Sequence, residues 1–197
     1  MLQIANVVNQ TEAEGPGLRA AIWFQGCTLN CPGCCNPTYL APQGGTPYEP
    51  VALAHELSAL DVEGITLLGG EPLQQVEPLI TFLDALRAIS DKGVMLFTGY
   101  SFPTIERMPR RLAAVQRCDL VVAGPYLQNL PDHERRWIGS RNQTVHFITE
   151  RYAALNDGWE PHRNEVEIHI RDGELVVNGT PIDLGMLEEG DCGQVYH

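Results

Sequence analysis

The stretch Ala20-Ala21-Ile22-Trp23-Phe24-Gln25-Gly26-Cys27-Thr28-Leu29-Asn30-Cys31-Pro32-Gly33-Cys34 joins a short apolar run to three closely spaced cysteines. Residues 20–24 predict a buried β-strand, because a short apolar run bounded by turn-forming residues is typical of a strand in a sheet core. The run leads directly into Gly26 and Cys27. We therefore expect the cysteine loop to begin where this strand ends.

The spacing Cys-x3-Cys-x2-Cys supplies three thiolates from one loop: Cys27, Cys31 and Cys34. A [4Fe–4S] cluster contains four irons, which four cysteines usually hold. Three cysteines leave one iron without a protein ligand. That iron could then bind a small molecule, as the open position of a catalytic zinc does.

Two other uses of these cysteines fit the sequence less well. A structural zinc site normally has four closed ligands, often as two Cys-x2-Cys pairs, and the remaining Cys118 and Cys192 are single and far apart. A disulfide framework fits poorly, because the sequence begins without an apolar signal segment. We expect reduced thiols in a cytoplasmic protein.

Length and composition indicate one globular domain with a sizeable core, since the chain has 197 residues and 44% hydrophobic content. Its 13 basic and 25 acidic residues give a formal net charge of −12, which disfavours non-specific binding to nucleic acid. No apolar run approaches the roughly 18–20 residues of a membrane helix. We expect neither a nucleic-acid partner nor a membrane association.

Strand-like and helix-like segments alternate along the chain after the cysteine loop. The patterns predict helices near 51–60, around Leu79–Leu86 and over 105–115 with a break at Pro109, and strands at 64–68, 94–97, 120–122 and 144–148. Such alternation predicts an α/β fold with a parallel sheet of about five units, too few for a closed eight-fold barrel. We expect a partial, open β/α barrel whose binding site lies at the carboxyl ends of the strands.

A second glycine-rich turn, Gly69-Gly70-Glu71-Pro72, directly follows the predicted strand at 64–68. Glycines let a backbone approach a ligand closely, and a carboxylate can accept hydrogen bonds from a cationic amine. The alternative is a tight turn in which Glu71 starts a helix. Since this turn and the cysteine loop both follow strands, we expect them at one edge of the sheet.

The last part of the chain has a different pattern. Residues 165–171 alternate polar and apolar side chains, Asp172-Gly173 is a turn signal, and residues 175–177 continue as a return strand. These features predict an antiparallel β-hairpin joined to the core through residues 158–164. We expect a core domain at 1–157 and a C-terminal hairpin extension at 158–197, which could cap the core or dock a partner.

Taken together, the cysteine loop and the Gly69–Pro72 turn resemble the motifs of radical S-adenosylmethionine (SAM) enzymes. Further segments are similar to the activases of glycyl radical enzymes, and in particular to the activating protein of anaerobic ribonucleotide reductase. These segments are Glu14–Arg19, Trp23–Cys27, Cys31–Pro37, Thr98–Tyr100, Gly124–Tyr126 and Gly139–Gln143. The resemblance covers roughly residues 1–150 and departs from the family at Cys35, where many relatives have an aromatic residue, and at Ala123, where they often have aspartate.

This resemblance implies a radical SAM fold and a [4Fe–4S] cluster. It implies that the cluster cleaves SAM reductively to a 5′-deoxyadenosyl radical, which removes hydrogen from a glycine of a partner anaerobic ribonucleotide reductase. A flavodoxin- or ferredoxin-like protein would donate the electron. The implied cluster ligands are Cys27, Cys31 and Cys34, and the implied SAM contacts are Gly33, Cys35, Gly69, Gly70, Glu71 and Pro72.

Several alternatives remain at this point. The chain could be a radical SAM enzyme that modifies a peptide or a small metabolite, or a non-enzymatic iron–sulfur module for electron transfer. Cys35 could be a fourth ligand, a redox-active thiol or a packed small hydrophobic residue. Cys118, just before a predicted strand, is expected in the core.

Overall fold

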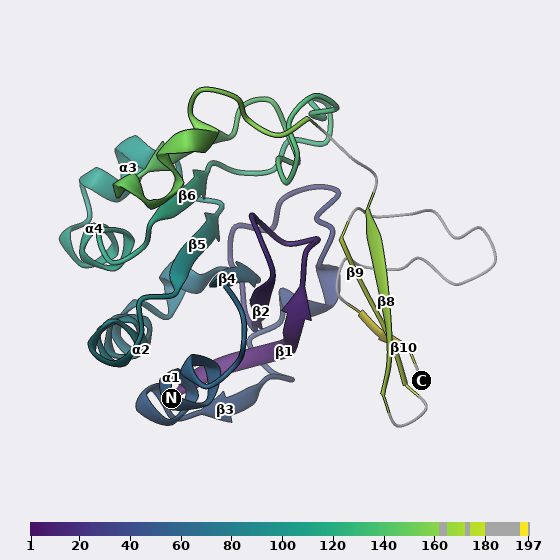
Figure 1. Ribbon diagram of the computed structural model, residues 1–197. Coiled ribbons are helices and arrows are strands. Elements are labelled where there is room, and N and C mark those ends of the chain that lie inside the picture. The colour runs from purple at the N-terminus through teal and green to yellow at the C-terminus, as the bar shows by residue number, and fades with distance from the viewer. Residues whose placement is uncertain (162–164, 172–173, 180–193, 197) are drawn as a thin grey trace.

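The computed structural model describes residues 1–161, 165–171, 174–179 and 194–196 (Figure 1). The larger of its two sheets has seven strands in the order β3-β1-β2-β4-β5-β6-β7. These strands are β1 (Leu2–Thr11), β2 (Arg19–Phe24), β3 (Thr46–Tyr48), β4 (Gly64–Gly69), β5 (Gly93–Thr98), β6 (Leu120–Ala123) and β7 (Thr144–Phe147). The helices are α1 (Pro50–Ser58), α2 (Val76–Ile89), α3 (Phe102–Glu106) and α4 (Pro109–Val115), with 3-10 turns η1 (Pro37–Tyr39), η2 (Pro72–Gln74) and η3 (Glu150–Leu155).

The centre of the large sheet is parallel. Strand β2 pairs with β4, β4 with β5 and β5 with β6, with Ile22 opposite Leu67 in the first of these pairs. All six residues of β2 are buried, as expected for a strand covered on both faces. The predicted strands at 20–24, 64–68, 94–97 and 120–122 are confirmed.

The expectation of about five parallel units is wrong at its last strand, because β7 runs antiparallel to β6. Residues 124–143 between these strands contain no helix. The connection therefore stays at the edge where β6 ends, and β7 runs back from it. Sequence reasoning also missed β1 and β3. Strand β1 pairs antiparallel with β2, and β3 pairs antiparallel with β1. The alternating buried Leu2 and Ile4 were an available signal for β1.

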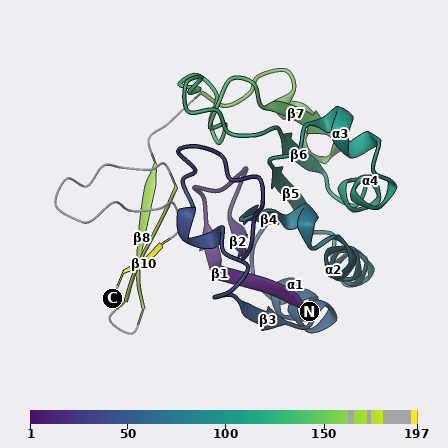
Figure 2. The same ribbon diagram turned by 180° about the vertical axis from the view of Figure 1, so that it is seen from behind.

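Helices cover one face of the sheet. Figures 1 and 2 show α1 to α4 along one side of the curved sheet and the hairpin on the other. The main hydrophobic core lies beneath these helices and includes Leu53 and Leu57 of α1 and Leu79, Leu83 and Leu86 of α2. The predicted break at Pro109 is confirmed, since this proline opens α4, where a missing N–H costs nothing. No helix in the described part of the chain is long and apolar enough to cross a bilayer.

The start of β2 contains a fully buried arginine, Arg19. Its guanidinium pairs with Glu63 at 2.8 Å and donates to the hydroxyls of Thr66 and Tyr152. It also donates to backbone carbonyls of Pro16, Ile65 and Gly93. The segment Glu14–Arg19 therefore stabilises the sheet edge opposite the cysteine loop.

The predicted C-terminal hairpin is confirmed as β8 (Val166–Arg171) and β9 (Glu174–Gly179), with β10 (Gln194–Tyr196) beside β9. The hairpin contacts the core through polar groups. Asn178 Nδ2 donates to Thr11 Oγ1 at 2.8 Å, and Gly179 N donates to Glu14 Oε1 at 3.0 Å. The predicted turn at 172–173, part of the predicted joint at 162–164, and Cys192 lie outside the described residues.

Candidate functional site

The loop that carries the cysteines, here called the cluster loop, spans residues 25–45 between β2 and β3. Its backbone is closed by hydrogen bonds from Gly26 N to Tyr39 O at 2.8 Å and from Cys27 N to Leu40 O at 3.0 Å. The buried Gln25 supports the loop further, because its side-chain amide donates to the carbonyls of Ala41 and Gln43. This glutamine was not predicted to have such a role.

Cys27, Cys31 and Cys34 are half-buried and close enough to influence one another. Burial raises the pKa of the Cys34 thiol to about 11, and the neighbouring Cys35, Cys31 and Cys27 add to this rise. Burial and the nearby Glu71 and Cys31 likewise raise the pKa of Cys27. Thiolates of Cys27 and Cys34 therefore need a cationic partner to be stable.

In the described part of the chain, no three or more His, Cys, Asp or Glu side chains are arranged to hold a single metal ion. Three thiols from one loop suit a multi-iron group, because each ligand binds a different iron. Two buried polar atoms, Trp23 Nε1 near the end of β2 and Asn36 Oδ1 within the cluster loop, have no hydrogen-bond partner among the described residues. The cluster loop thus carries three thiols together with a buried acceptor, Asn36 Oδ1, that a bound polar group could satisfy.

The Gly69–Pro72 segment lies directly against the start of the cluster loop. Gly70 N donates to Phe24 O at 2.8 Å, and Glu71 N donates to Gly26 O at 3.0 Å. A Cβ atom on Gly70 would lie 2.6 Å from Gly26 O, so only glycine permits this approach. The expectation that the two loops share one edge of the sheet is confirmed.

Glu71 is 1% exposed, and its carboxylate joins its own segment to Thr98 and Gly99 at the end of β5. Oε1 accepts from Leu73 N and from Thr98 Oγ1, both at 2.9 Å, and Oε2 accepts from Gly99 N at 2.8 Å. Burial raises the pKa of Glu71 to about 7, although these hydrogen bonds oppose the rise. Glu71 also precedes η2 as its N-cap, so the alternative of a helix-starting turn is correct as well. A carboxylate has about four acceptor positions, which leaves one for a ligand.

A polar network missed by sequence reasoning ties the cluster loop to the helices. The Gln74 side chain accepts from Thr28 N at 3.1 Å and donates to Thr28 Oγ1 and to the Tyr100 hydroxyl. Arg111 of α4 donates to the same hydroxyl at 3.0 Å and stacks on the Tyr100 ring. Gln74 follows the Gly69–Pro72 motif closely, but a glutamine near a turn is usually a surface residue.

The remaining expected residues lie in the same loop. Gly33 has a φ of 71°, a left-handed conformation that favours glycine. Cys35 is exposed, so the expectation that it could be a packed hydrophobic residue is wrong. Cys118 is fully buried in the main core, as predicted, and burial raises its pKa to about 12.

Comparison with known proteins identifies the chemistry of this site. A family model described as a 4Fe-4S single cluster domain matches residues 13–146, which include the cluster loop and the Gly69–Pro72 segment. The protein is an oxidoreductase of the radical SAM class, and its cofactors are a [4Fe–4S] cluster and SAM.

Its relatives define the family within that class. The chain is 32% identical over 144 residues to the anaerobic ribonucleoside-triphosphate reductase-activating protein of Enterobacteria phage T4, covering 69% of this chain and 88% of the relative. It is 30% identical over 142 residues to the protein of the same name from Escherichia coli (strain K12), covering 68% and 91%. The chain belongs to the family of the anaerobic ribonucleoside-triphosphate reductase-activating proteins.

Proposed function

We propose that this protein activates an anaerobic ribonucleotide reductase by removing a hydrogen atom from one of its glycines. One observation carries the proposal: the cluster loop and the Gly69–Pro72 segment meet through the hydrogen bonds that Gly70 and Glu71 donate. The names of the relatives supply the substrate, since each is an activating protein for such a reductase.

In this proposal Cys27, Cys31 and Cys34 hold the cluster. When bound, the cluster and SAM together supply a 5′-deoxyadenosyl radical through reductive cleavage of a carbon–sulfur bond. The electron comes from a flavodoxin- or ferredoxin-like donor. The residues that would contact SAM are Gly33, Cys35, Gly69, Gly70, Glu71 and Pro72.

The protein's own contribution is positioning. Glu71 holds its segment against Thr98 and Gly99, so the ends of β4 and β5 keep a fixed spacing. The acceptor position left on its carboxylate would accept a hydrogen bond from the ammonium group of SAM when SAM is bound. Gln74 binds Thr28 of the cluster loop through two hydrogen bonds. These bonds also hold the adjacent Cys27 in position.

The arrangement of the strands supports the proposed radical SAM function. We interpret the seven-stranded sheet as a partial β/α barrel of the radical SAM type, since its parallel strands place both loops at their carboxyl ends. Residues 1–157 would form this core in a cytoplasmic protein. The hairpin in residues 158–197 lies beyond the segment that the family model matches.

The test is anaerobic. The cluster-loaded protein is mixed with reductant, SAM and the reductase, 5′-deoxyadenosine is measured by chromatography, and the glycyl radical is measured by electron paramagnetic resonance. We expect both products, and none from Cys31→Ala. SAM cleavage without a glycyl radical would point to another peptide or metabolite substrate, whereas a loaded cluster that never cleaves SAM would indicate an electron-transfer module.

A further inference from the structure

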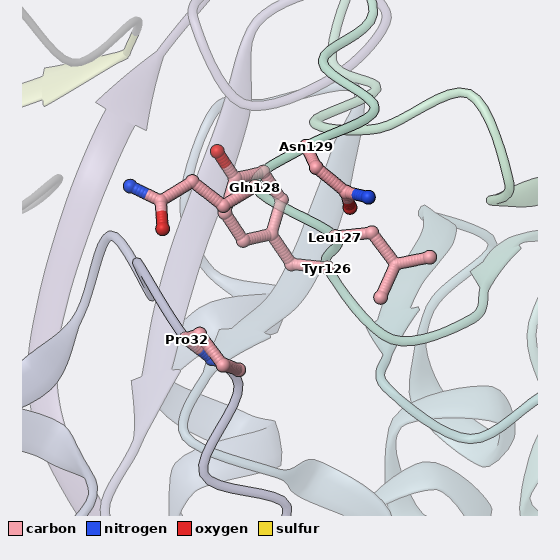
Figure 3. A pocket seen from close by; sticks show the side chains of 5 residues that line it. All are labelled: Pro32, Tyr126, Leu127, Gln128 and Asn129. Atoms are coloured by element: carbon pink, nitrogen blue, oxygen red, sulfur yellow. The ribbon is translucent and has the colours of Figure 1, made fainter.

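A pocket of about 410 Å³ opens beside the cluster loop and has no role in the function proposed so far. Figure 3 shows Pro32 on one side of the pocket and the loop after β6 on the other. The lining residues of that loop are Tyr126, Leu127, Gln128 and Asn129. This volume is within the usual range of ligand-binding pockets.

The pocket adjoins the cysteines directly. Pro32 is the residue between Cys31 and Gly33. A Cβ atom on Gly33 would lie 2.7 Å from Gln128 Cδ, so the Gln128 side chain lies against the cluster loop. A ligand in this pocket would therefore lie next to the expected cluster ligands.

The wall formed by residues 124–129 is held from behind by the Gly139–Gln143 segment. Ser140 Oγ accepts from Leu127 N at 3.1 Å, and Asn142 Nδ2 donates to Pro125 O at 2.7 Å. Gln143 Nε2 donates to Gly124 O at 3.1 Å. Gly124–Tyr126 and Gly139–Gln143, two of the segments singled out in the sequence, thus belong to one preorganised wall.

The pocket lining is uncharged and combines apolar side chains with two carboxamides. None of the five lining residues carries a charge, in a chain of net charge −12. The exposed carboxamides of Gln128 and Asn129 have no hydrogen-bond partner among the described residues. Each offers an N–H donor and a carbonyl acceptor, which is the pair that a peptide backbone complements. Pro32, Tyr126 and Leu127 add apolar surface.

We propose that this pocket receives the partner's backbone around the glycine that is to be activated, and that Gln128 and Asn129 hold that backbone by hydrogen bonds. This inference rests on the proposed function and adds the place where the partner's chain lies. A phosphate or carboxylate ligand is disfavoured, because the lining contains no cationic side chain to pair with it.

Photo-crosslinking tests the location. Benzoylphenylalanine is introduced at position 128 of the cluster-loaded protein, which is irradiated with the reductase, and the adduct is mapped by mass spectrometry. The control carries the same group at position 116, an exposed glutamine after α4 at the opposite edge of the sheet. We expect position 128 to label the glycine-bearing segment and position 116 to leave it unlabelled. The proposal is overturned if position 128 labels a different segment of the reductase or labels nothing at all.

A pair of variants tests the hydrogen bonds. We expect Gln128→Ala combined with Asn129→Ala to raise both the Kd and the KM for the reductase about tenfold, the effect of losing one to two hydrogen bonds. Gln116→Ala is the matched control. An unchanged Kd and KM in the double variant overturns the proposal, as does a loss of SAM affinity in place of reductase affinity. Failure of the unaltered protein to form a glycyl radical would instead contradict the proposed function.

Discussion

Replacing Gly70 by alanine should separate the two halves of the site. The added Cβ would lie 2.6 Å from Gly26 O and 2.9 Å from Phe24 O, closer than real contacts allow. These oxygens belong to the backbone and cannot rotate away as a flexible side chain could. They are also the acceptors for Glu71 N and Gly70 N. Relief of the clash therefore stretches both hydrogen bonds.

The expected cost follows from these contacts. Weakening two hydrogen bonds removes about 1 kcal/mol each, and overpacking at a rigid position costs about 1–3 kcal/mol. We expect the free energy of unfolding to fall by about 3 kcal/mol or more, which corresponds to a decrease in Tm of roughly 6–12 °C for a chain of this size. The displaced Gly26 should also move the adjacent Cys27 and lower the iron content.

Two measurements check this prediction. Urea unfolding of the cluster-free protein, followed by circular dichroism, gives the stability, and iron and sulfide analysis after reconstitution gives cluster loading. Gly158→Ala is the matched control, because a Cβ at Gly158 meets nothing within 4 Å. The reasoning is refuted if Gly70→Ala matches the control within about 0.5 kcal/mol and binds a full complement of iron.

Three further predictions concern single side chains. Cys31→Ala should abolish cluster assembly, and full iron content in this variant would contradict the ligand assignment. Glu71→Ala should retain the cluster but weaken SAM binding about tenfold, a loss of about 1.4 kcal/mol in equilibrium titration; unchanged affinity would remove Glu71 from the SAM site. Burial raises the pKa of Glu14 to about 7, so the folded state holds this proton more tightly than the unfolded state. Protonation of Glu14 contributes about 3 kcal/mol to the free energy of unfolding. This contribution is complete below about pH 4.5 and is lost as the pH rises through about 7. Glu14→Gln should flatten this part of the stability–pH profile measured by urea unfolding; an unaltered slope would show that Glu14 titrates normally.

Local patterns in the sequence accounted for much of the fold and the site. The strands at 20–24 and 64–68 are short apolar runs, and the glycines and cysteines that follow them are contiguous in the chain. The strands and their loops were therefore predictable, and so was the meeting of both loops at one sheet edge. The hairpin of β8 and β9 was predictable for the same reason, since alternation and a turn signal define it within 15 residues, 165–179.

Contacts between distant residues were decided only by the tertiary structure. The reversed direction of β7 depends on a connection that stays at one edge, and the pairing of the buried Arg19 with Glu63 joins positions 44 residues apart. The partners of the Glu71 carboxylate at Thr98 and Gly99 come from another strand end. Likewise, the pocket exists only because Pro32 meets residues 126–129 across the sheet edge. A periodic pattern specifies which face of an element is buried, but it does not specify which distant side chain will lie opposite, because that depends on packing of the whole chain.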